Sequence, residues 1–247
     1  MEKLFVNRLK DLSAQAERSG RYTYSAFLNY DEQNELRQTE RELTAVKLFG
    51  GAKGCERVIA RFGSAEDIGY DEDFPIVLLK AEPLMQKFAD YLTHRDILGA
   101  LMSLGIDRST TGDIILKDNI AYIFCLNRTA DFICDNLTKI KHTDIKCSIA
   151  EKLPDCELYH TENVLINTAS ERLDCLISSL YKMSRNKTNL LFSGEKVFIN
   201  GKQCLNNSVI PKEGDIISVR GYGRFIFNGK ERTTKKGREY ISVSEYK

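Results

Sequence analysis

The fold of the C-terminal third is indicated by residues 170–202, which read SERLDCLISSLYKMSRNKTNLLFSGEKVFINGK. Ser170 precedes leucine and isoleucine residues at the three-and-four spacing of an amphipathic helix, so we expect Ser170 to cap that helix. Ser184 stands before a second short helical pattern, which Gly194 closes. The stretch therefore predicts two short consecutive helices followed by a strand.

Two strands are predicted after these helices. The first runs from Val197 into the Asn200-Gly201 turn pair, and the second begins after Gly214-Asp215 and covers residues 216–221. Because both are short and apolar, we expect them to pair. Residues 233–238 then form a basic tail, for which a phosphate contact and a solvated hairpin are both open interpretations.

Positive charge is concentrated in the same part of the chain. From residue 181 onward there are 14 Lys and Arg against 6 Asp and Glu, a net charge of +8; the preceding residues carry 22 against 29, a net charge of −7. This asymmetry indicates that the C-terminal part meets a polyanion, because a Lys or Arg placed beside a phosphate releases condensed counterions. A solvated basic face remains the alternative at this stage.

Residues 1–72 predict a small N-terminal α/β domain. Apolar residues at helical spacing from Glu2 to Ser19 predict a first helix, ended by Gly20, and residues 31–44 predict a second. An acidic segment before Pro75 then marks a junction.

Residues 73–160 predict a β-α-β-β-α-β order, the ferredoxin-like arrangement that RRM domains also use. The apolar spacing from Leu84 to Leu104 favours one long helix, bent near Thr93, and Asp118-Asn119 predicts a hairpin turn. The remaining predicted elements are strands over 75–80, 113–117, 120–126 and 145–149, and a helix over 129–140.

An RRM stacks bases on aromatic residues of its two central strands. The third predicted strand carries Tyr122 and Phe124, but the first strand carries no aromatic residue and the usual basic-Gly-aromatic motif is missing. We therefore interpret these two rings as packing residues.

Residues 170 to about 225 resemble the S4 RNA-binding domain in residue type, order and spacing. The matching residues are Arg172-Leu173-Asp174, Ser184-Arg185, Gly194, Val197, Ile199-Asn200-Gly201, Gly214-Asp215 and Val219-Arg220. The resemblance implies an α+β chain whose residues 161–247 form an S4 domain of the αL type with a basic extension.

The start of the helix after Ser184 would present N–H groups and positive side chains to phosphates. Asp174 is at least as well suited to anchoring the helix pair as to touching RNA. The candidate RNA-binding residues are Arg172, Ser184, Arg185, Lys187, Lys202, Arg220, Arg224, Lys235 and Lys236.

Further motifs, spread over most of the chain, resemble the YlmH family. They are Phe49-Gly50-Gly51, Glu56-Arg57, His94-Arg95-Asp96, Leu98-Gly99-Ala100-Leu101, Leu104-Gly105-Ile106, Gly112-Asp113-Ile114 and Arg220-Gly221-Tyr222-Gly223-Arg224-Phe225. The resemblance implies an N-terminal α/β domain, an RRM-like central domain and an S4 domain. It further implies binding to rRNA and tRNA on large ribosomal subunits obstructed by stalled synthesis. We assign the motifs of the first two domains structural roles.

Catalytic, metal and cofactor sites are not expected. His94-Arg95-Asp96 resembles a kinase catalytic loop, but that loop needs Asn where Leu101 stands. Residues 50–54 lack the Gly-Lys-Ser/Thr ending of a phosphate-binding loop, and the cysteines lack the spacing of zinc pairs. The chain has an odd number of cysteines, 7, and no long apolar segment, so we expect a protein of the cytoplasm, away from membranes. We also expect it to be a monomer.

Two other functions remain open. S4 domains are often joined to pseudouridine synthases and methyltransferases, so an RNA-modifying enzyme is the main alternative. The residues before the S4 region are read as two small units, which leaves no room for a large cofactor domain. A scaffold that uses its S4 surface to bind a protein is the third.

Overall fold

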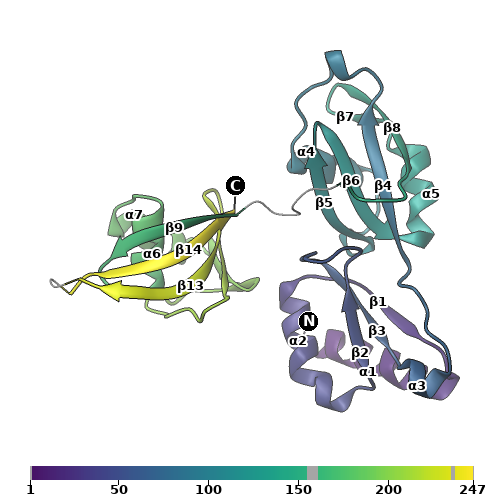
Figure 1. Cartoon of the computed structure of the whole chain (residues 1–247), viewed down its shortest axis with the longest axis horizontal. Helices are drawn as coiled ribbons and strands as arrows, with labels where there is room; N and C mark the ends of the chain where they lie inside the picture. Colours follow the sequence, from purple (N-terminus) through teal and green to yellow (C-terminus); the bar gives the residue numbers. More distant parts are fainter. Residues whose placement is uncertain (1, 155–160, 235–236, 247) are drawn as a thin grey trace. The chain divides into compact units, whose positions relative to one another are not determined.

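The computed structural model describes residues 2–154, 161–234 and 237–246. The chain divides into an N-terminal unit, Met1–Leu158, and a C-terminal unit, Tyr159–Lys247 (Figure 1). Helices and three antiparallel sheets occur together in these residues, as expected for an α+β chain. No helix in the described part of the chain is both long and apolar enough to cross a membrane.

The N-terminal unit begins with helices packed on a small antiparallel sheet of order β1-β3-β2, here called the N-terminal sheet. Helix α1 ends one residue before Gly20, as predicted, and Leu9, Leu36 and Phe62 form the centre of the core between helices and sheet. The elements are α1 (Glu2–Ser19), β1 (Thr23–Leu28), α2 (Tyr30–Thr39), β2 (Val46–Phe49), β3 (Val58–Phe62) and α3 (Ala65–Ile68).

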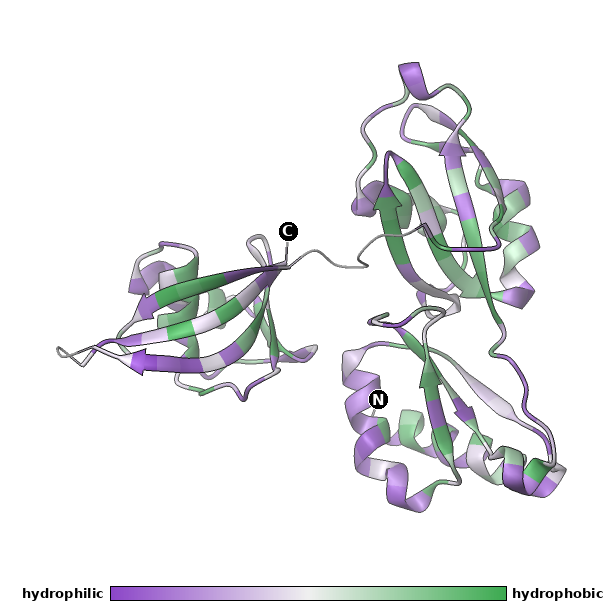
Figure 2. Ribbon diagram, in the orientation of Figure 1, coloured by the Kyte–Doolittle hydropathy of each residue, from purple (hydrophilic) through white to green (hydrophobic). Residues whose placement is uncertain are grey.

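The same unit continues into a five-stranded antiparallel sheet, the central sheet, of order β5-β6-β4-β8-β7. Its elements follow the predicted β-α-β-β-α-β order, with the two-residue strand β7 added. They are β4 (Ile76–Pro83), α4 (His94–Ser103), β5 (Thr111–Lys117), β6 (Ile120–Leu126), α5 (Asn127–Asn136), β7 (Lys139–Ile140) and β8 (Thr143–Ile149). Strands β5 and β6 are largely green, the colour of hydrophobic residues, in Figure 2.

The prediction of one helix from Leu84 to Leu104 is wrong. Strand β4 runs to Pro83, a single 3-10 turn covers Gln86–Phe88, and helix α4 begins only at His94. Thr93 caps that helix in a capping box with Asp96, which fixes the helix start there. The predicted second and fourth helices also end earlier than expected, at Thr39 and Asn136.

Alternate residues of the central sheet pack into two different cores, because side chains along a strand point to opposite faces. Leu79 and Ile123 face helices α4 and α5, with Ile97 and Ile133 beside them. Phe124, on the other face, packs against strands of the N-terminal sheet in a second core. This second core joins the two sheets into one unit.

Two glycines allow this close packing. A Cβ added to Gly112 would lie 2.6 Å from a ring carbon of Phe27, and one added to Gly51 would lie closer still to a ring carbon of Phe124. Gly51 also has a φ of 104°, which favours glycine. These residues belong to two of the motifs that the sequence singled out, and their place at the junction supports a structural role.

The C-terminal unit is a six-stranded sheet of order β11-β10-β12-β13-β14-β9 with two helices packed on it. The predicted pairing of the strands after residues 197 and 216 is confirmed, because β10 and β12 are antiparallel neighbours. The elements are β9 (Thr161–Thr168), α6 (Leu173–Leu180), α7 (Arg185–Ser193), β10 (Val197–Ile199), β11 (Lys202–Gln203), β12 (Ile216–Val219), β13 (Gly223–Thr233) and β14 (Glu239–Tyr246).

The prediction that Ser170 caps the first of these helices is wrong. Arg172 is the N-cap residue of α6, and its side chain makes no capping hydrogen bond. Backbone carbonyls cap the helix instead: the Leu173 amide donates to the Val209 carbonyl at 2.8 Å, and the Asp174 amide donates to the Asn207 carbonyl at 3.1 Å.

Candidate nucleic-acid interface

The start of helix α7 carries the predicted phosphate-binding residues on an exposed surface. Ser184 is the N-cap residue, and its hydroxyl oxygen accepts a hydrogen bond from the Lys187 amide at 3.3 Å. Arg185 and Lys187 are exposed in the first turn. The positive end of the helix dipole and two cationic side chains therefore lie together, which favours an anion.

Arg172 lies on the neighbouring helix, but its charge is already paired. Its guanidinium donates to both carboxylate oxygens of Asp174, at 3.1 and 2.9 Å. This contact raises the pKa of Arg172. Asp174 also accepts a hydrogen bond from the Cys175 amide at 2.9 Å, so its carboxylate anchors the start of α6.

Arg185 lines a small polar pocket of about 170 Å³ in the C-terminal unit. Ser178 and Ser179 of helix α6 line the same pocket, and Arg238 reaches it from the residues just before strand β14. Asn167 holds the Arg238 guanidinium in place. The guanidinium donates hydrogen bonds to the backbone carbonyl of Asn167 at 3.0 Å and to the side-chain oxygen of Asn167. The pocket thus brings two guanidinium groups together with the hydroxyl residues Thr168, Ser178 and Ser179. Its lining also includes Asp174, whose carboxylate is paired with Arg172.

The sequence did not single out Arg238 as an individual binding residue. It lies in the basic tail, but its position beside Arg185 depends on the pairing of β14 with β9, which joins residues 239–246 to residues 161–168. That pairing is long-range, so no local pattern predicts it. The alternation of apolar residues from 239 to 246 was the available signal for a strand.

Other predicted residues contact aromatic rings in the C-terminal unit. The Lys187 ammonium lies 5.5 Å from the Tyr222 ring centroid, and Tyr222 in turn packs on Tyr181 at 5.5 Å between ring centroids. The Arg220 guanidinium lies 4.5 Å from the centroid of the Phe198 ring. Such cation–π pairs orient charged groups while leaving their N–H donors available to another partner.

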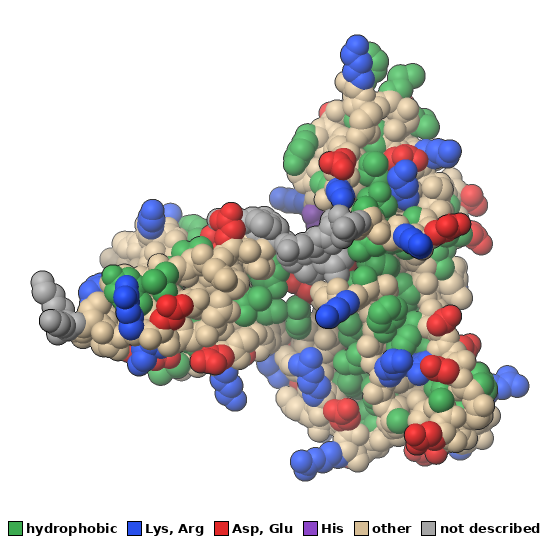
Figure 3. Space-filling view, in the orientation of Figure 1, with side chains coloured by type: hydrophobic (Ala, Val, Ile, Leu, Met, Phe, Trp, Pro, Cys, Tyr) green, Lys and Arg blue, Asp and Glu red, His purple; other side chains and the backbone are tan. Residues whose placement is uncertain are grey.

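The remaining predicted residues are more dispersed. Arg224 lies over the ring of Tyr246 at 4.4 Å, and Lys202 stands in the exposed edge strand β11. Lys235 and Lys236 lie outside the described residues. Figure 3 shows lysine and arginine side chains over the visible face of the C-terminal unit, with fewer acidic ones among them.

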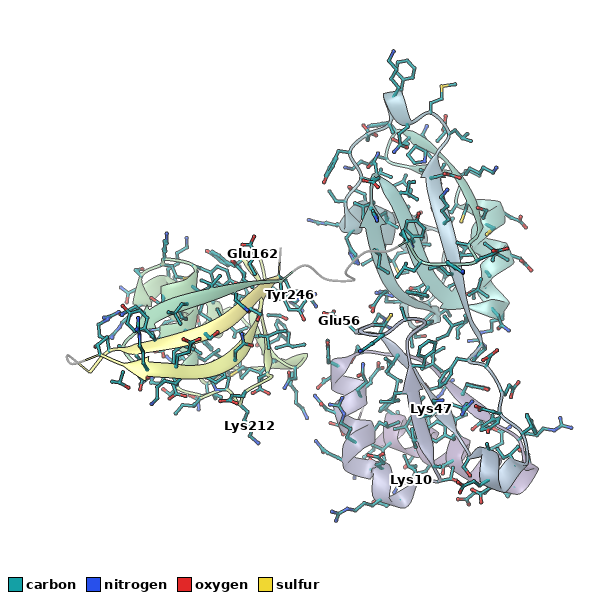
Figure 4. All side chains as sticks on the ribbon, viewed as in Figure 1. Lys10, Lys47, Glu56, Glu162, Lys212 and Tyr246 are labelled. Atoms are coloured by element: carbon teal, nitrogen blue, oxygen red, sulfur yellow. The ribbon has the colours of Figure 1, made fainter. Side chains whose placement is uncertain are left out.

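The motifs of the N-terminal unit are used in the structure itself. Asp113, which is 5% exposed, accepts hydrogen bonds from the amides of Glu56 at 2.5 Å and Arg57 at 3.3 Å. The Arg57 guanidinium donates to backbone carbonyls of Thr111 at 3.1 Å and Phe27 at 2.9 Å. Figure 4 labels Glu56 in this unit. These bonds join the N-terminal and central sheets.

The His94-Arg95-Asp96 motif is part of a helix start. The Asp96 carboxylate accepts hydrogen bonds from the Thr93 amide at 2.9 Å and pairs with the Lys141 ammonium at 2.6 Å. These contacts, with Lys141 the strongest, lower the pKa of Asp96 to about 2. Among the described residues, no cluster of three or more His, Cys, Asp or Glu side chains could hold a metal ion.

A family model and a known relative match parts of this chain. Residues 70–152 match the family model described as "Putative RNA-binding domain in YlmH". The chain is also 30% identical over 158 residues to "Ribosome-associated protein quality control protein P2" of Bacillus subtilis (strain 168), a match that covers 62% of this chain and 60% of the relative. Residues 70–152 are thus similar to that YlmH domain, and the chain spans 60% of the length of the Bacillus subtilis relative.

A solved YlmH structure is also similar. It is described as "Cell division protein ylmH from Streptococcus pneumoniae" and is 22% identical, with a TM-score of 0.49, covering 60% of this chain and 90% of that chain.

Proposed function

We propose that this chain binds rRNA or tRNA on the large ribosomal subunit and acts in the rescue or quality control of stalled 50S particles. The observation that carries the proposal is the start of helix α7, where Ser184, Arg185 and Lys187 form an exposed cationic surface beside Arg238. The name of the Bacillus subtilis relative supports the ribosomal setting.

We further propose that the C-terminal unit is the S4 domain and the principal RNA-binding part. Two short consecutive helices packed on a sheet, with the Asn200-Gly201 turn between β10 and β11, support this assignment. The central sheet supports an RRM-like domain, because its four long strands have the order of the ferredoxin-like arrangement. We expect the protein to act as a monomer in the cytoplasm.

We propose that the protein works by binding, without catalysis. The motif that resembles a kinase catalytic loop, at residues 94–96, supports local structure, because Asp96 takes part in the capping box that starts helix α4. An RNA-modifying enzyme is the alternative. Mass mapping of rRNA and tRNA from a deletion strain separates the two: we expect every modification to be retained, and a missing one restored by the gene would establish the enzyme.

The ribosomal proposal is tested by sucrose-gradient sedimentation of the full chain in cells with stalled synthesis. We expect the protein in 50S fractions, and we expect an Arg185→Ala/Lys187→Ala variant to shift toward the top of the gradient. A matched control removes two exposed charges from helix α1 of the N-terminal unit, Lys3→Ala/Arg8→Ala. If the unaltered protein stays at the top under every stalling condition, the proposal is wrong.

A further inference from the structure

A loop of the N-terminal unit exposes four large apolar side chains. Leu84, Met85, Phe88 and Tyr91 are 63%, 68%, 78% and 81% exposed. They occupy residues 84–91 between strand β4 and helix α4, here called the aromatic loop, which includes the small turn at the top of Figure 1. Apolar side chains gathered in this way in a folded protein indicate an interaction surface.

The aromatic loop is held at both of its flanks by hydrogen bonds to two neighbouring turns. The Asn119 side chain accepts from the Leu92 amide at 2.8 Å and donates to the Asp90 carbonyl at 2.9 Å. The Asp90 carboxylate accepts from the His142 amide at 3.0 Å. Further bonds are Gln86 to the Asp118 carbonyl at 2.7 Å, the Leu84 amide to the Asp144 carbonyl at 3.0 Å, the Asp90 amide to Thr143 at 2.8 Å and Lys141 to the Tyr91 carbonyl at 3.1 Å.

These bonds give the loop a defined conformation. Backbone and side-chain groups of residues 84–91 bond to partners within the unit, while the four large apolar side chains are exposed to solvent. A loop ordered in this way loses little conformational freedom when a partner binds, which favours recognition.

Base stacking on the central sheet itself is restricted. Phe124, on the third strand of the β-α-β-β-α-β order, is 3% exposed because Phe27 and Ile59 of the N-terminal sheet pack in the same core. The rest of that face borders a cavity of about 710 Å³ whose lining carries the carboxylates of Asp73 and Glu151 against the single cation of Lys47. This charge balance disfavours a phosphate chain.

The aromatic loop has the composition that single-stranded RNA requires. Phe88 and Tyr91 offer two ring faces, and the Lys87 ammonium lies 5.8 Å from the Phe88 ring centroid, where it can meet a phosphate beside a stacked base. The loop also falls within residues 70–152, the part that matches the family model described as an RNA-binding domain. An apolar protein partner would not call for a cation beside the exposed Phe88 ring.

We propose that the aromatic loop is a second RNA-binding site, which stacks unpaired bases of single-stranded RNA on Phe88 and Tyr91 while Lys87 contacts the phosphate chain. The proposal rests on the proposed RNA-binding function and adds a site in the N-terminal unit. The basic surface of the C-terminal unit binds the phosphate backbone, and the aromatic loop recognises bases that are free to unstack.

The sequence has 0 Trp, so a tryptophan introduced at the site is the only source of indole fluorescence, and this allows a direct test. A Phe88→Trp variant of the full chain carries a single indole at the site, and base stacking should quench its fluorescence when a single-stranded oligouridylate or oligoadenylate is added. The matched control is Phe132→Trp, at a position on helix α5 that is 46% exposed. An abasic oligonucleotide of equal length, which keeps the phosphates, should leave both variants unquenched.

Quenching of Phe88→Trp by the abasic strand as well, or equal quenching of the two variants, would overturn the stacking proposal. A Phe88→Ala/Tyr91→Ala variant measures how much the two rings contribute to the affinity for single-stranded RNA. Stacking is worth about 1 to 3 kcal/mol for each base, so removal of each ring should weaken binding of single-stranded RNA by about 5-fold to about 140-fold. Because every phosphate-binding side chain is kept, the slope of log affinity against log salt should stay unchanged.

The readouts separate this proposal from the proposed function. If the unaltered chain binds no RNA and no ribosome, the proposed function fails. If it binds RNA and the Phe88→Ala/Tyr91→Ala variant binds equally well, only the second site fails. If that variant keeps its RNA affinity but leaves the 50S fractions, the loop binds a protein and the RNA assignment is overturned.

Discussion

Phe124, on strand β6 of the central sheet, and Tyr222, in the turn between strands β12 and β13 of the C-terminal unit, are aromatic residues in opposite surroundings. Phe124 of the central sheet is 3% exposed among apolar side chains, whereas Tyr222 of the C-terminal unit is 39% exposed with the Lys187 ammonium over its ring. An aromatic ring is therefore open to a stacking partner only where its face is uncovered, as it is at Tyr222 and is not at Phe124.

The contrast between these two aromatic residues is tested most directly by replacing Phe124. Because the side chain lies in a core between two sheets, Phe124→Ala should lower the free energy of unfolding by about 3 to 5 kcal/mol. Urea unfolding followed by circular dichroism measures this. Tyr222→Ala, the matched change on the open side, should cost far less stability. A stable Phe124→Ala protein with weakened RNA binding would show that the central sheet is an RNA surface.

The junction between the sheets can be tested at Gly112. A Cβ there would lie 2.6 Å from a ring carbon of Phe27, so Gly112→Ala should overpack the shared core and lower the free energy of unfolding by about 1 to 3 kcal/mol. Gly99→Ala is the control. Gly99 lies in helix α4 with nothing within 4 Å of its added Cβ, so alanine should stabilise the helix by about 0.5 to 1 kcal/mol. Equal effects of the two changes would contradict the tight packing.

The exposed cationic surface at the start of helix α7 is tested by Arg185→Ala/Lys187→Ala. Both residues are exposed, so the free energy of unfolding should change by no more than about 0.5 kcal/mol at each site. RNA binding should respond instead: the slope of log affinity against log salt should fall by about 0.7 to 0.9 for each phosphate that no longer meets a cationic side chain. Fluorescence anisotropy of labelled RNA over a salt series measures it. An unchanged slope would move the phosphate site elsewhere.

The smallest expected effect is the acid response of Asp96. Its pKa is about 2 in the folded protein, below the ordinary value of 3.8, because Lys141 and Thr93 favour the carboxylate. The stabilisation is therefore fully present above about pH 4 and is lost as the pH falls toward 2. Asp96→Asn should flatten this part of the stability profile, measured by melting temperature against pH. If Asp96→Asn leaves the melting temperature below about pH 4 unaltered, Asp96 is not ion-paired in solution.

Local signals in the sequence predicted much of the fold. Asp118 and Asn119 form the expected tight hairpin turn, with φ values of 51° and 61°, because both residue types tolerate the left-handed region. The two short helices and the pairing of β10 with β12 follow from turn residues and apolar spacing. These features depend on neighbours in the sequence.

The aromatic loop shows why other features could not be predicted. Its apolar residues at 84, 85, 88 and 91 have helical spacing, yet they face solvent, since spacing reports a pattern and not the surface that covers it. Thr93 and Asp96 were a helix-start signal that would have corrected the boundary. The burial of Phe124 and the approach of Arg238 to Arg185 depend on residues far away in the sequence.

The pairing of strands β9 and β14 has a consequence for biosynthesis. Thr161 of β9 is the register partner of Tyr246 of β14, so the first strand of the C-terminal unit cannot pair fully until residues near position 246 have been made. During translation, helices α6 and α7 can form locally, but the sheet closes only after those residues have left the exit tunnel. Until then the nascent unit carries an unpaired strand edge that other chains could join.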